Sequence, residues 1–524
     1  MIAHDVQEQT PIHQELQTAV RHSLVYGLGT VAGKAIGFLM VPFYTHYLTP
    51  ADYGVLEILD LSVSLFGMFL NMGITTALLQ AHAAAKTTRE KQKVASTALL
   101  AVVATGLATL VLLVSVVRPL SSLLVGPQVP PQYLLLSLTA FALNYISNLP
   151  GTYVRALEKS SWFAVLEVSA LVLALALNIL FIAVLKFGLL GVLLSSVIAA
   201  GLQAVVLIAW MLSRVGIAFS RRLLRRMIGY GMPLILSNVA LFTLNFSDRY
   251  FLQHFRSLTV VGLYAVGYKF GFTINYLLVL PFTSMWQARM YIVHKRSDHP
   301  KIFGQIFVFY SVLLTYAVLA LAMFSPELMR LAVDSKFSGA EPVIPIVAVA
   351  YLFCGIAYCA RTGTFVTGRT GIVAALSVAT AILNLSLNWI LIPRAGMLGA
   401  AWATLASFAA LAAANYWFSQ RVIRLPLGMW RVIGALMVAC GFYVVGRWWA
   451  PQRMDLAILL KLMLLVLFPI ALWKARVFSA AELTTLAAVT DGLGRWIARR
   501  PAHAAPAAGV MRAPEPALQK GAHE

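Results

Sequence analysis

Long apolar blocks follow one another along most of the chain, separated by short polar stretches. The blocks are about 19 to 29 residues long, and roughly 20 apolar residues in a helix suffice to cross a bilayer core. They show no apolar–polar alternation of the kind that barrel strands have, so each block predicts a helix. Fourteen spans are expected, at about 23–48, 53–80, 94–117, 132–155, 162–185, 188–213, 228–253, 260–288, 302–325, 343–367, 371–393, 396–419, 429–449 and 456–474.

The composition agrees with a polytopic membrane protein. Of the 524 residues, 60% are hydrophobic and 11% are charged, whereas a soluble domain is about 25% charged. This excludes an ordinary soluble enzyme, a disordered chain and a disulfide scaffold. The three cysteines lie inside apolar blocks, which predicts packing thiols rather than a disulfide framework. No P-loop, metalloprotease motif or nucleophile elbow is present in the sequence, so we expect no enzyme activity, no cofactor and no metal site.

The net charge of +21 comes from 40 basic and 19 acidic residues. If the predicted loops alternate between the two sides of a membrane, 27 basic residues fall on one side and 8 on the other. Basic loops face the cytoplasm. The split therefore predicts that both termini are cytoplasmic, and it explains the charge without nucleic-acid binding.

Similar short sequences recur in the same order in both halves of the chain. Tyr26-Gly27-Leu28 opens the first span and Tyr230-Gly231-Met232 opens the seventh. Further pairs are Tyr53-Gly54-Val55 with Gly262-Leu263-Tyr264, and Gly188-Leu189-Leu190-Gly191 with Gly396-Met397-Leu398-Gly399. Six spans are an even number, so the chain returns to the side of the membrane where it began and the second copy has the same orientation as the first. Two parallel six-helix lobes related by an axis along the membrane normal are a transporter architecture.

The repeat predicts how the chain is divided. The most basic loop lies between spans 6 and 7, and spans 13 and 14 fall outside the repeat. The expected parts are a cytoplasmic N-terminal segment 1–22, an N-lobe 23–213, a basic cytoplasmic linker 214–227, a C-lobe 228–419, two further spans within 420–478, an amphipathic surface helix 479–500 and a disordered tail 501–524.

Ionisable side chains at membrane depth are expensive, roughly 2.5–3.5 kcal/mol each, and face a polar cavity more often than lipid. Lys34, Asp60, Lys269 and Arg361 lie deep in spans 1, 2, 8 and 10. Asp248 and Arg249 lie near the outer end of span 7 and are further candidates for the lumen. Three cations and one anion in the deep set favour an anionic cargo.

Pairing between helices for packing alone is the alternative explanation of these charges. Lys34 with Asp60, and Lys269 with Asp248, are possible pairs between adjacent spans. Prolines late in a span are candidates for hinges, because a proline removes a helical hydrogen bond and permits a bend. Pro42 and Pro281 occupy such positions, and a static kink is the simpler explanation for either.

Three stretches resemble bacterial polysaccharide-export flippases. They are Leu48-Thr49-Pro50-Ala51-Asp52-Tyr53-Gly54, Asp248-Arg249-Tyr250-Phe251-Leu252, and Asn384 with Ile392-Pro393 and Gly396-Met397-Leu398-Gly399-Ala400-Ala401. Over roughly residues 20–475 the chain is similar to the Wzx-type, or polysaccharide-transport, branch of the multidrug/oligosaccharidyl-lipid/polysaccharide (MOP) exporter superfamily. The resemblance implies an all-α fold of two six-helix lobes in a V, like multidrug (MATE) exporters of that superfamily.

The resemblance also implies a function. Such a protein moves an undecaprenyl-diphosphate-linked oligosaccharide from the cytoplasmic to the periplasmic leaflet for O-antigen, capsule or exopolysaccharide synthesis. Its partners would be the lipid-linked oligosaccharide, membrane lipid and other polysaccharide-assembly proteins. Two alternatives stay open: a multidrug cation antiporter of the same superfamily, which needs deep carboxylates, and a membrane polymerase or ligase of lipid-linked sugars, which needs a large outer loop.

Overall fold

A computed structural model of the chain describes residues 40–71, 74–157, 160–449, 451, 453–475 and 477. Within these residues every regular element is a helix. Nine helical segments among them are long and apolar enough to cross a membrane. One of these, α16 (Thr370–Val422), is two helices joined at a kink at Gly396, so it accounts for spans 11 and 12 together. The predicted all-α membrane fold is confirmed.

The first lobe holds the predicted spans 2 to 6. Residues 40–47 are helical and belong to the end of span 1. The helices that follow are α2 (Pro50–Asn71), α3 (Ile74–Ala84), α4 (Thr88–Ser115), α5 (Val117–Leu124), α6 (Pro131–Ala156), α7 (Ser160–Asn178) with the π-helical turn η1 (Ile179–Val184), and α8 (Gly188–Val215).

The second lobe repeats this order. Its first helix begins at Arg221, inside the segment expected to be a linker. The elements are α9 (Arg221–Phe246), α10 (Asp248–Phe255), α11 (Leu258–Ile274), the π-helical turn η2 (Asn275–Val279), α12 (Leu280–His294), α13 (His299–Ala332), the 3₁₀ turn η3 (Ser335–Ala340), α14 (Val343–Ala360), α15 (Thr362–Val366) and α16. The two added helices are α17 (Met429–Trp448) and α18 (Met454–Lys474).

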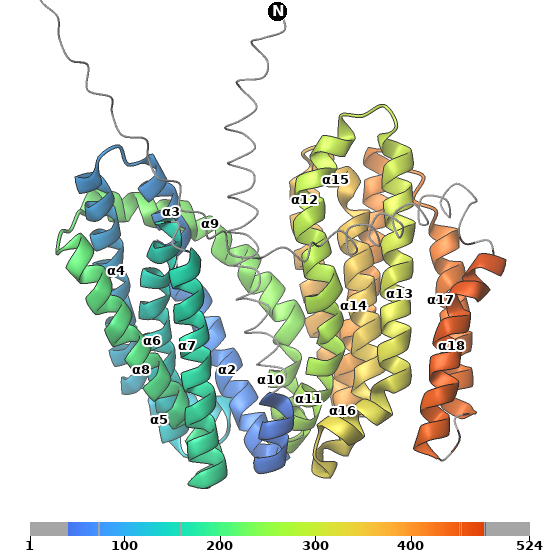
Figure 1. Ribbon diagram of the computed structural model, residues 1–524, viewed down its shortest axis with the longest axis horizontal. Helices are drawn as coiled ribbons and strands as arrows, with labels where there is room; N and C mark the ends of the chain where they lie inside the picture. The colour runs from blue at the N-terminus through green and yellow to red at the C-terminus, as the bar shows by residue number, and fades with distance from the viewer. Residues whose placement is uncertain are drawn as a thin grey trace, which may run out of the picture.

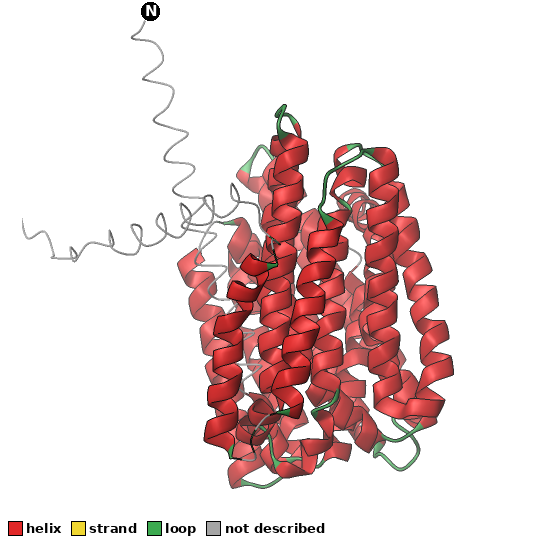
Figure 2. Ribbon diagram, turned by 90° about the vertical axis from the view of Figure 1, so that its right-hand side faces the viewer, coloured by secondary structure: helices red, strands yellow, loops and turns green. Residues whose placement is uncertain are grey.

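The two lobes stand side by side and meet at one end, as Figure 1 shows. There α2 of the first lobe reaches α10 and α11 of the second, while α9 crosses from one lobe to the other. From the side the helices run nearly parallel from one end of the molecule to the other (Figure 2). Segment 1–22, most of span 1 with Lys34, the expected surface helix 479–500 and the tail 501–524 lie outside the described residues.

The lobes meet through two glycines at equivalent positions. A Cβ on Gly54 of α2 would overlap the carbonyl oxygen of Leu258, and a Cβ on Gly262 of α11 would overlap that of Pro50. Each glycine thus lies against the carbonyl of the residue four positions before the other. Small residues allow helix backbones to approach this closely in a membrane. The reciprocal contact is what a two-fold relation between the lobes produces.

The last hairpin of each lobe also uses a matched glycine. A Cβ on Gly191 would contact the backbone of Phe181, and a Cβ on Gly399 would overlap the carbonyl of Leu391. In the second hairpin the bend is made by Gly396, with φ +57°, a region that glycine occupies without strain. The paired glycines support the six-span repeat.

The two candidate hinge prolines lie in described helices. Pro281 is in the first turn of α12, directly after the π-helical turn η2. Proline cannot supply the N–H that an α-helix needs, and a wider turn before it accommodates the lost bond. Pro42 lies in helix 40–47, and its carbonyl accepts a hydrogen bond from the Thr45 hydroxyl (3.0 Å). Their role as hinges stays a prediction.

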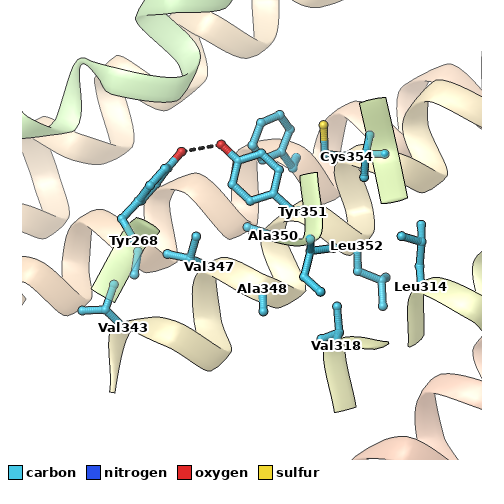
Figure 3. Packing of buried hydrophobic residues seen from close by; sticks show 14 of the residues in the cluster. Tyr268, Leu314, Val318, Val343, Val347, Ala348, Ala350, Tyr351, Leu352 and Cys354 are labelled. Carbon is cyan, nitrogen blue, oxygen red and sulfur yellow. Dashed lines mark hydrogen bonds between the residues drawn. The ribbon is translucent and has the colours of Figure 1, made fainter. Parts of the chain in front are cut away.

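The second lobe has the larger apolar core. Figure 3 shows part of it, in which Val343 and Val347 of α14 lie beside Tyr268 of α11, while Leu352 of α14 lies on the side of Leu314 and Val318 of α13. Of the two added helices, α17 packs against α13, and α18 makes an ion pair with it, because Lys461 of α18 donates to Glu327 of α13 (2.7 and 2.8 Å) and both side chains are buried. Such a pair is costly to break from one side, so it fixes where α18 attaches.

Replacing Gly54 with alanine should loosen the contact between the lobes, because the new methyl group overlaps the Leu258 carbonyl. We expect the free energy of unfolding to fall by about 1–3 kcal/mol, the usual cost of overpacking. Gly434→Ala in α17 is the matched control, since nothing lies within 4 Å of its added Cβ. Thermal unfolding of the purified protein measures both variants. Equal stability of Gly54→Ala and Gly434→Ala would contradict the close crossing.

Candidate functional site

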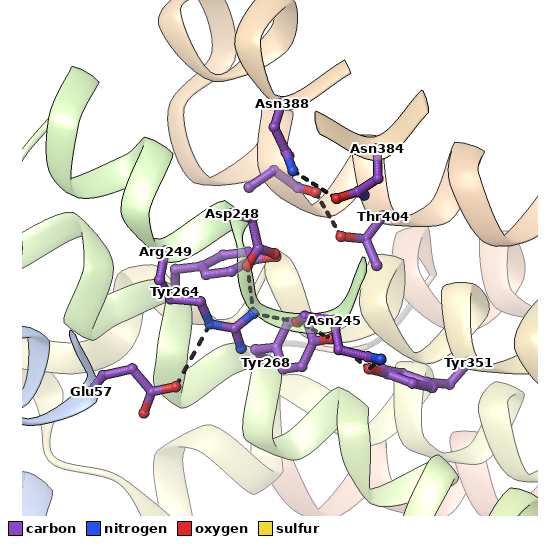
Figure 4. Close-up of polar contacts among 11 residues, drawn as sticks. Glu57, Asn245, Asp248, Arg249, Tyr264, Tyr268, Tyr351, Asn384, Asn388 and Thr404 are labelled. Atoms are coloured by element: carbon purple, nitrogen blue, oxygen red, sulfur yellow. Dashed lines mark hydrogen bonds and ion pairs between the residues drawn. The ribbon is translucent and has the colours of Figure 1, made fainter. Parts of the chain in front are cut away.

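A chain of polar side chains crosses from one lobe to the other (Figure 4). Its centre is Arg249 of α10, whose NH1 donates to Asp248 Oδ1 at 2.6 Å. Tyr264 of α11 donates to the other Asp248 oxygen at 2.5 Å. On its far side, Arg249 Nε lies 3.6 Å from Glu57 Oε1 of α2.

Aromatic rings enclose the Arg249 guanidinium. Its central carbon lies 3.8 Å from the ring centre of Tyr268 and 5.0 Å from that of Tyr264. The Tyr268 and Tyr351 hydroxyls are 2.5 Å apart, and Tyr351 donates to Asn245 Oδ1 at 2.7 Å. Arg249 is 1% exposed and Asp248 is 2% exposed. The structure therefore places these two predicted lumen candidates inside the protein, where they fix α10 against α11.

Lys269 is the part of this network that is open to the surroundings. Its Nζ donates to the Tyr53 hydroxyl at 2.9 Å and lies 3.7 Å from Glu57 Oε2. The side chain remains 44% exposed although it comes from the middle of a long apolar helix. Asp60 of α2 is also exposed and lies close enough to Lys269 and Glu57 for their charges to interact. Lys269 and Asp60 thus approach each other from the two lobes.

Arg361 is not part of this cluster. It joins α14 to α15, is half-buried, and lies 4.3 Å from the ring centre of Tyr358 and 4.9 Å from that of Phe365. In the described residues no carboxylate lies within ion-pair distance of it. Arg361 is therefore a separate cation of the second lobe, held against aromatic rings rather than against an acid.

The cluster contains more carboxylates than the sequence analysis expected at membrane depth. The structure brings Glu57 and Asp248 into the cluster, so three carboxylates, with Asp60, face the two cations Arg249 and Lys269. The possible pair of Lys269 with Asp248 is not formed, because Asp248 is held by Arg249 and Tyr264 while Lys269 contacts Glu57. Counting deep charges alone therefore does not decide the charge of a cargo.

The contacts within a lobe are shorter than the ion pairs between lobes. Inside the second lobe, the hydrogen bonds that Asp248 accepts from Arg249 and Tyr264 are 2.6 and 2.5 Å long. Glu57 approaches Arg249 and Lys269 at 3.6 and 3.7 Å across the junction. Since charge-assisted hydrogen bonds are about 2.7–2.9 Å long, the cross-lobe ion pairs are the ones that separate most readily.

The three stretches that carry the family resemblance build this junction and its support. Thr49 and Asp52 cap α2 reciprocally (Thr49 Oγ1 to Asp52 Oδ2, 2.6 Å; Asp52 N to Thr49 Oγ1, 3.1 Å), with Pro50 at the first helical position. The second stretch begins with Asp248 and Arg249. In the third, Asn388 donates to Asn384 (2.9 Å), which donates to Ser407 (3.2 Å), and so joins the two halves of α16.

Sequence reasoning missed the tyrosines and Asn245 in this network. A tyrosine in an apolar helix gives no periodic signal, and its hydroxyl partners come from other helices. It also passed over Glu327 and Lys461, although a lysine inside span 14 was visible in the sequence. In the described residues no group of three or more His, Cys, Asp or Glu side chains could hold a metal ion.

Two parallel lobes that meet at α2 and α11 give this chain the fold of solved membrane transporters. The structure matches the lipid II flippase MurJ in an inward closed conformation with a TM-score of 0.70 and 12% identity, over 87% of this chain and 100% of that chain. It matches an inward-facing multidrug resistance MATE family transporter of the MOP superfamily with a TM-score of 0.61 and 14% identity, over 74% and 94% of the two chains. At these identities the likeness establishes the fold.

The chain belongs to the polysaccharide biosynthesis protein family, whose sequence profile matches residues 19–286. This confirms the resemblance read from the sequence. The uncharacterized membrane protein MJ1068 of Methanocaldococcus jannaschii is 23% identical over 223 residues, which cover 40% of this chain and 41% of that protein. The chain therefore spans less than half the length of this curated relative.

Arg249→Met should destabilise the protein strongly, because it leaves Asp248 charged and buried without its cation. Breaking one side of a buried pair costs about 3–5 kcal/mol. Adding Asp248→Asn removes the unpaired charge and should recover part of that loss. The free energy of unfolding of the purified variants decides this. A double variant less stable than Arg249→Met would refute the pairing.

Proposed function

We propose that the protein is a flippase that moves an undecaprenyl-diphosphate-linked oligosaccharide across the bacterial inner membrane, from the cytoplasmic to the periplasmic leaflet. The observation that carries the proposal is a polysaccharide biosynthesis family profile on a chain with the fold of a protein named as a lipid II flippase. The product would serve a surface or exported polysaccharide, such as O-antigen or capsule. Both termini would be cytoplasmic, as the 27-to-8 split of basic loop residues supports.

Two cations of the second lobe are proposed to contact the diphosphate. Arg361 lies toward the inner end of span 10, and Lys269 lies in the outer half of span 8. Both give charge-assisted contacts to phosphate oxygens. Arg361 would bind the diphosphate first. Lys269, positioned by its contacts with Tyr53 and Glu57, would then bind it near the junction. The polyprenyl tail can remain in lipid while only the polar head moves between the lobes.

The remaining candidates have supporting roles in this proposal. Asp60, exposed beside Lys269, would contact sugar hydroxyls or balance the charge of Lys269. Lys34 of the first span would contact the cargo as well. Asp248 and Arg249 would position α10 and α11. Pro42 and Pro281 would bend as the lobes rock, and rocking of rigid bodies around a central site is how two-lobe transporters alternate access.

The multidrug cation antiporter shares this fold, so the fold does not separate the two functions. What favours the flippase is the family profile together with Arg361, a half-buried cation that has no acidic partner among the described residues. A site built for cations would place a carboxylate there, since an opposite charge stabilises a cargo at membrane depth.

Lys269→Ala and Arg361→Ala should each slow translocation roughly 10-fold, because a hydrogen bond to a charged group contributes about 1.5–3 kcal/mol. Lys269→Arg should retain most activity, since phosphate contact needs the charge. The measurement is flipping of a fluorescent polyprenyl-diphosphate-linked saccharide in proteoliposomes.

Lys295→Ala is the matched control, because it removes an exposed lysine after α12. Wild-type flipping rates in both Lys269→Ala and Arg361→Ala would contradict the cation sites. Transport of an organic cation, with no flipping of the lipid-linked saccharide by the wild-type protein, would replace the proposed function by antiport.

A further inference from the structure

A cavity of about 510 Å³ opens at the end of the first lobe that is remote from the junction. It lies between the end of α3, the start of α4 and the start of α9. Alanines of α3 and the buried side chains of Val94 and Met227 form its wall, and Lys93 and Arg226 lie at its rim. The cavity thus combines an apolar wall with two exposed cations.

The cavity is held in shape by hydrogen bonds from α4 to the end of α8 and to the loop that leads into α9. Ser96 of α4 donates to the Gly216 carbonyl (2.9 Å) and accepts from the Ala218 N–H (2.8 Å). Thr97 accepts from the Ser220 N–H (3.2 Å), and Gln92 donates to the Arg214 carbonyl (3.0 Å). The start of α9 is therefore fixed against α4.

The one carboxylate at the rim is already engaged. Glu90 accepts hydrogen bonds from the backbone N–H groups of Lys86 (2.9 Å) and Thr87 (3.3 Å), in a capping box that starts α4. Its charge therefore serves the helix terminus, where acidic residues are favourable. Lys93 and Arg226 have no ion-pair partner among the described residues.

The start of α9 lacks the acidic residues that a helix N-terminus favours. Its first turn carries Arg221 and Arg222 and no acid, and its N-cap residue Ser220 makes no side-chain capping bond. The positive end of the helix dipole and these arginines repel each other. An anion bound beside this end of the helix would relieve that repulsion.

We propose that this cavity binds an anionic phospholipid of the adjacent leaflet, with its headgroup phosphate between Lys93 and Arg226 and an acyl chain along the alanine wall of α3. The apolar wall selects a lipid over free phosphate, which would leave that wall unused. Basic pockets between helices at the cytoplasmic side are suited to such headgroups. The site is separate from Lys269 and Arg361, and a lipid there would tie α9, the helix that links the lobes, to α3 and α4.

Native mass spectrometry of the purified full-length protein tests this proposal with phosphatidylglycerol, and with phosphatidylcholine as the uncharged comparison. Lys93→Gln with Arg226→Gln should weaken phosphatidylglycerol binding roughly 10-fold or more, because two charge-assisted contacts are lost. The matched control removes two exposed lysines from the same end of the second lobe, Lys295→Gln with Lys301→Gln, and should bind as the wild type does.

A second variant keeps both charges and fills the cavity. Ala81→Leu projects from the α3 wall and should reduce lipid binding while the thermal unfolding temperature is unchanged. Inorganic phosphate in excess should not displace the lipid. The proposal is overturned if the wild type binds phosphatidylcholine equally, if both charge variants lose binding alike, if Ala81→Leu binds normally, or if inorganic phosphate displaces the lipid.

Discussion

The contact of α2 with α11 at Gly54 and Gly262 is the constraint on which the rest of the structure depends. Each backbone occupies the space that a Cβ of the other helix would need. This closeness lets Glu57, one turn further along α2, reach Arg249 and Lys269 of the other lobe. Without two glycines at the crossing, the helices would stand further apart and the polar chain between the lobes would not close.

The same contact explains the division of roles among the charges. Arg249 and Asp248 are buried with short hydrogen bonds and so keep the second lobe rigid. Lys269 and Asp60 lie at the edge of the junction and stay exposed. If the lobes rock, the longer Glu57 ion pairs separate while the Asp248–Arg249 pair persists. Lys269, which we propose to contact the cargo, would then exchange Glu57 for a phosphate of the cargo. One anion beside the lysine is thus replaced by another at the moment that the junction opens.

Hydrophobic patterning predicted the all-α membrane fold and the order of its helices in two lobes, because both follow from apolar length and order along the chain. It also found Asp60, Lys269, Arg361, Asp248 and Arg249 as unusual residues. Their burial could not be predicted, because depth along one helix does not tell which helix of the other lobe faces it. Tyr264, Tyr268 and Tyr351 were missed for the same reason, since their partners lie up to 106 residues away.

The central claim is that the junction parts as the opposite ends of the lobes approach. Electron–electron resonance distances test it in a variant without native cysteines, with one label pair at Lys86 and Lys301 and the other at Arg118 and Arg394, all exposed positions. On addition of a polyprenyl-diphosphate-linked saccharide, we predict that the first distance shortens in part of the population while the second lengthens. Two unchanged distances, or two that change in the same direction, would contradict rocking about this junction.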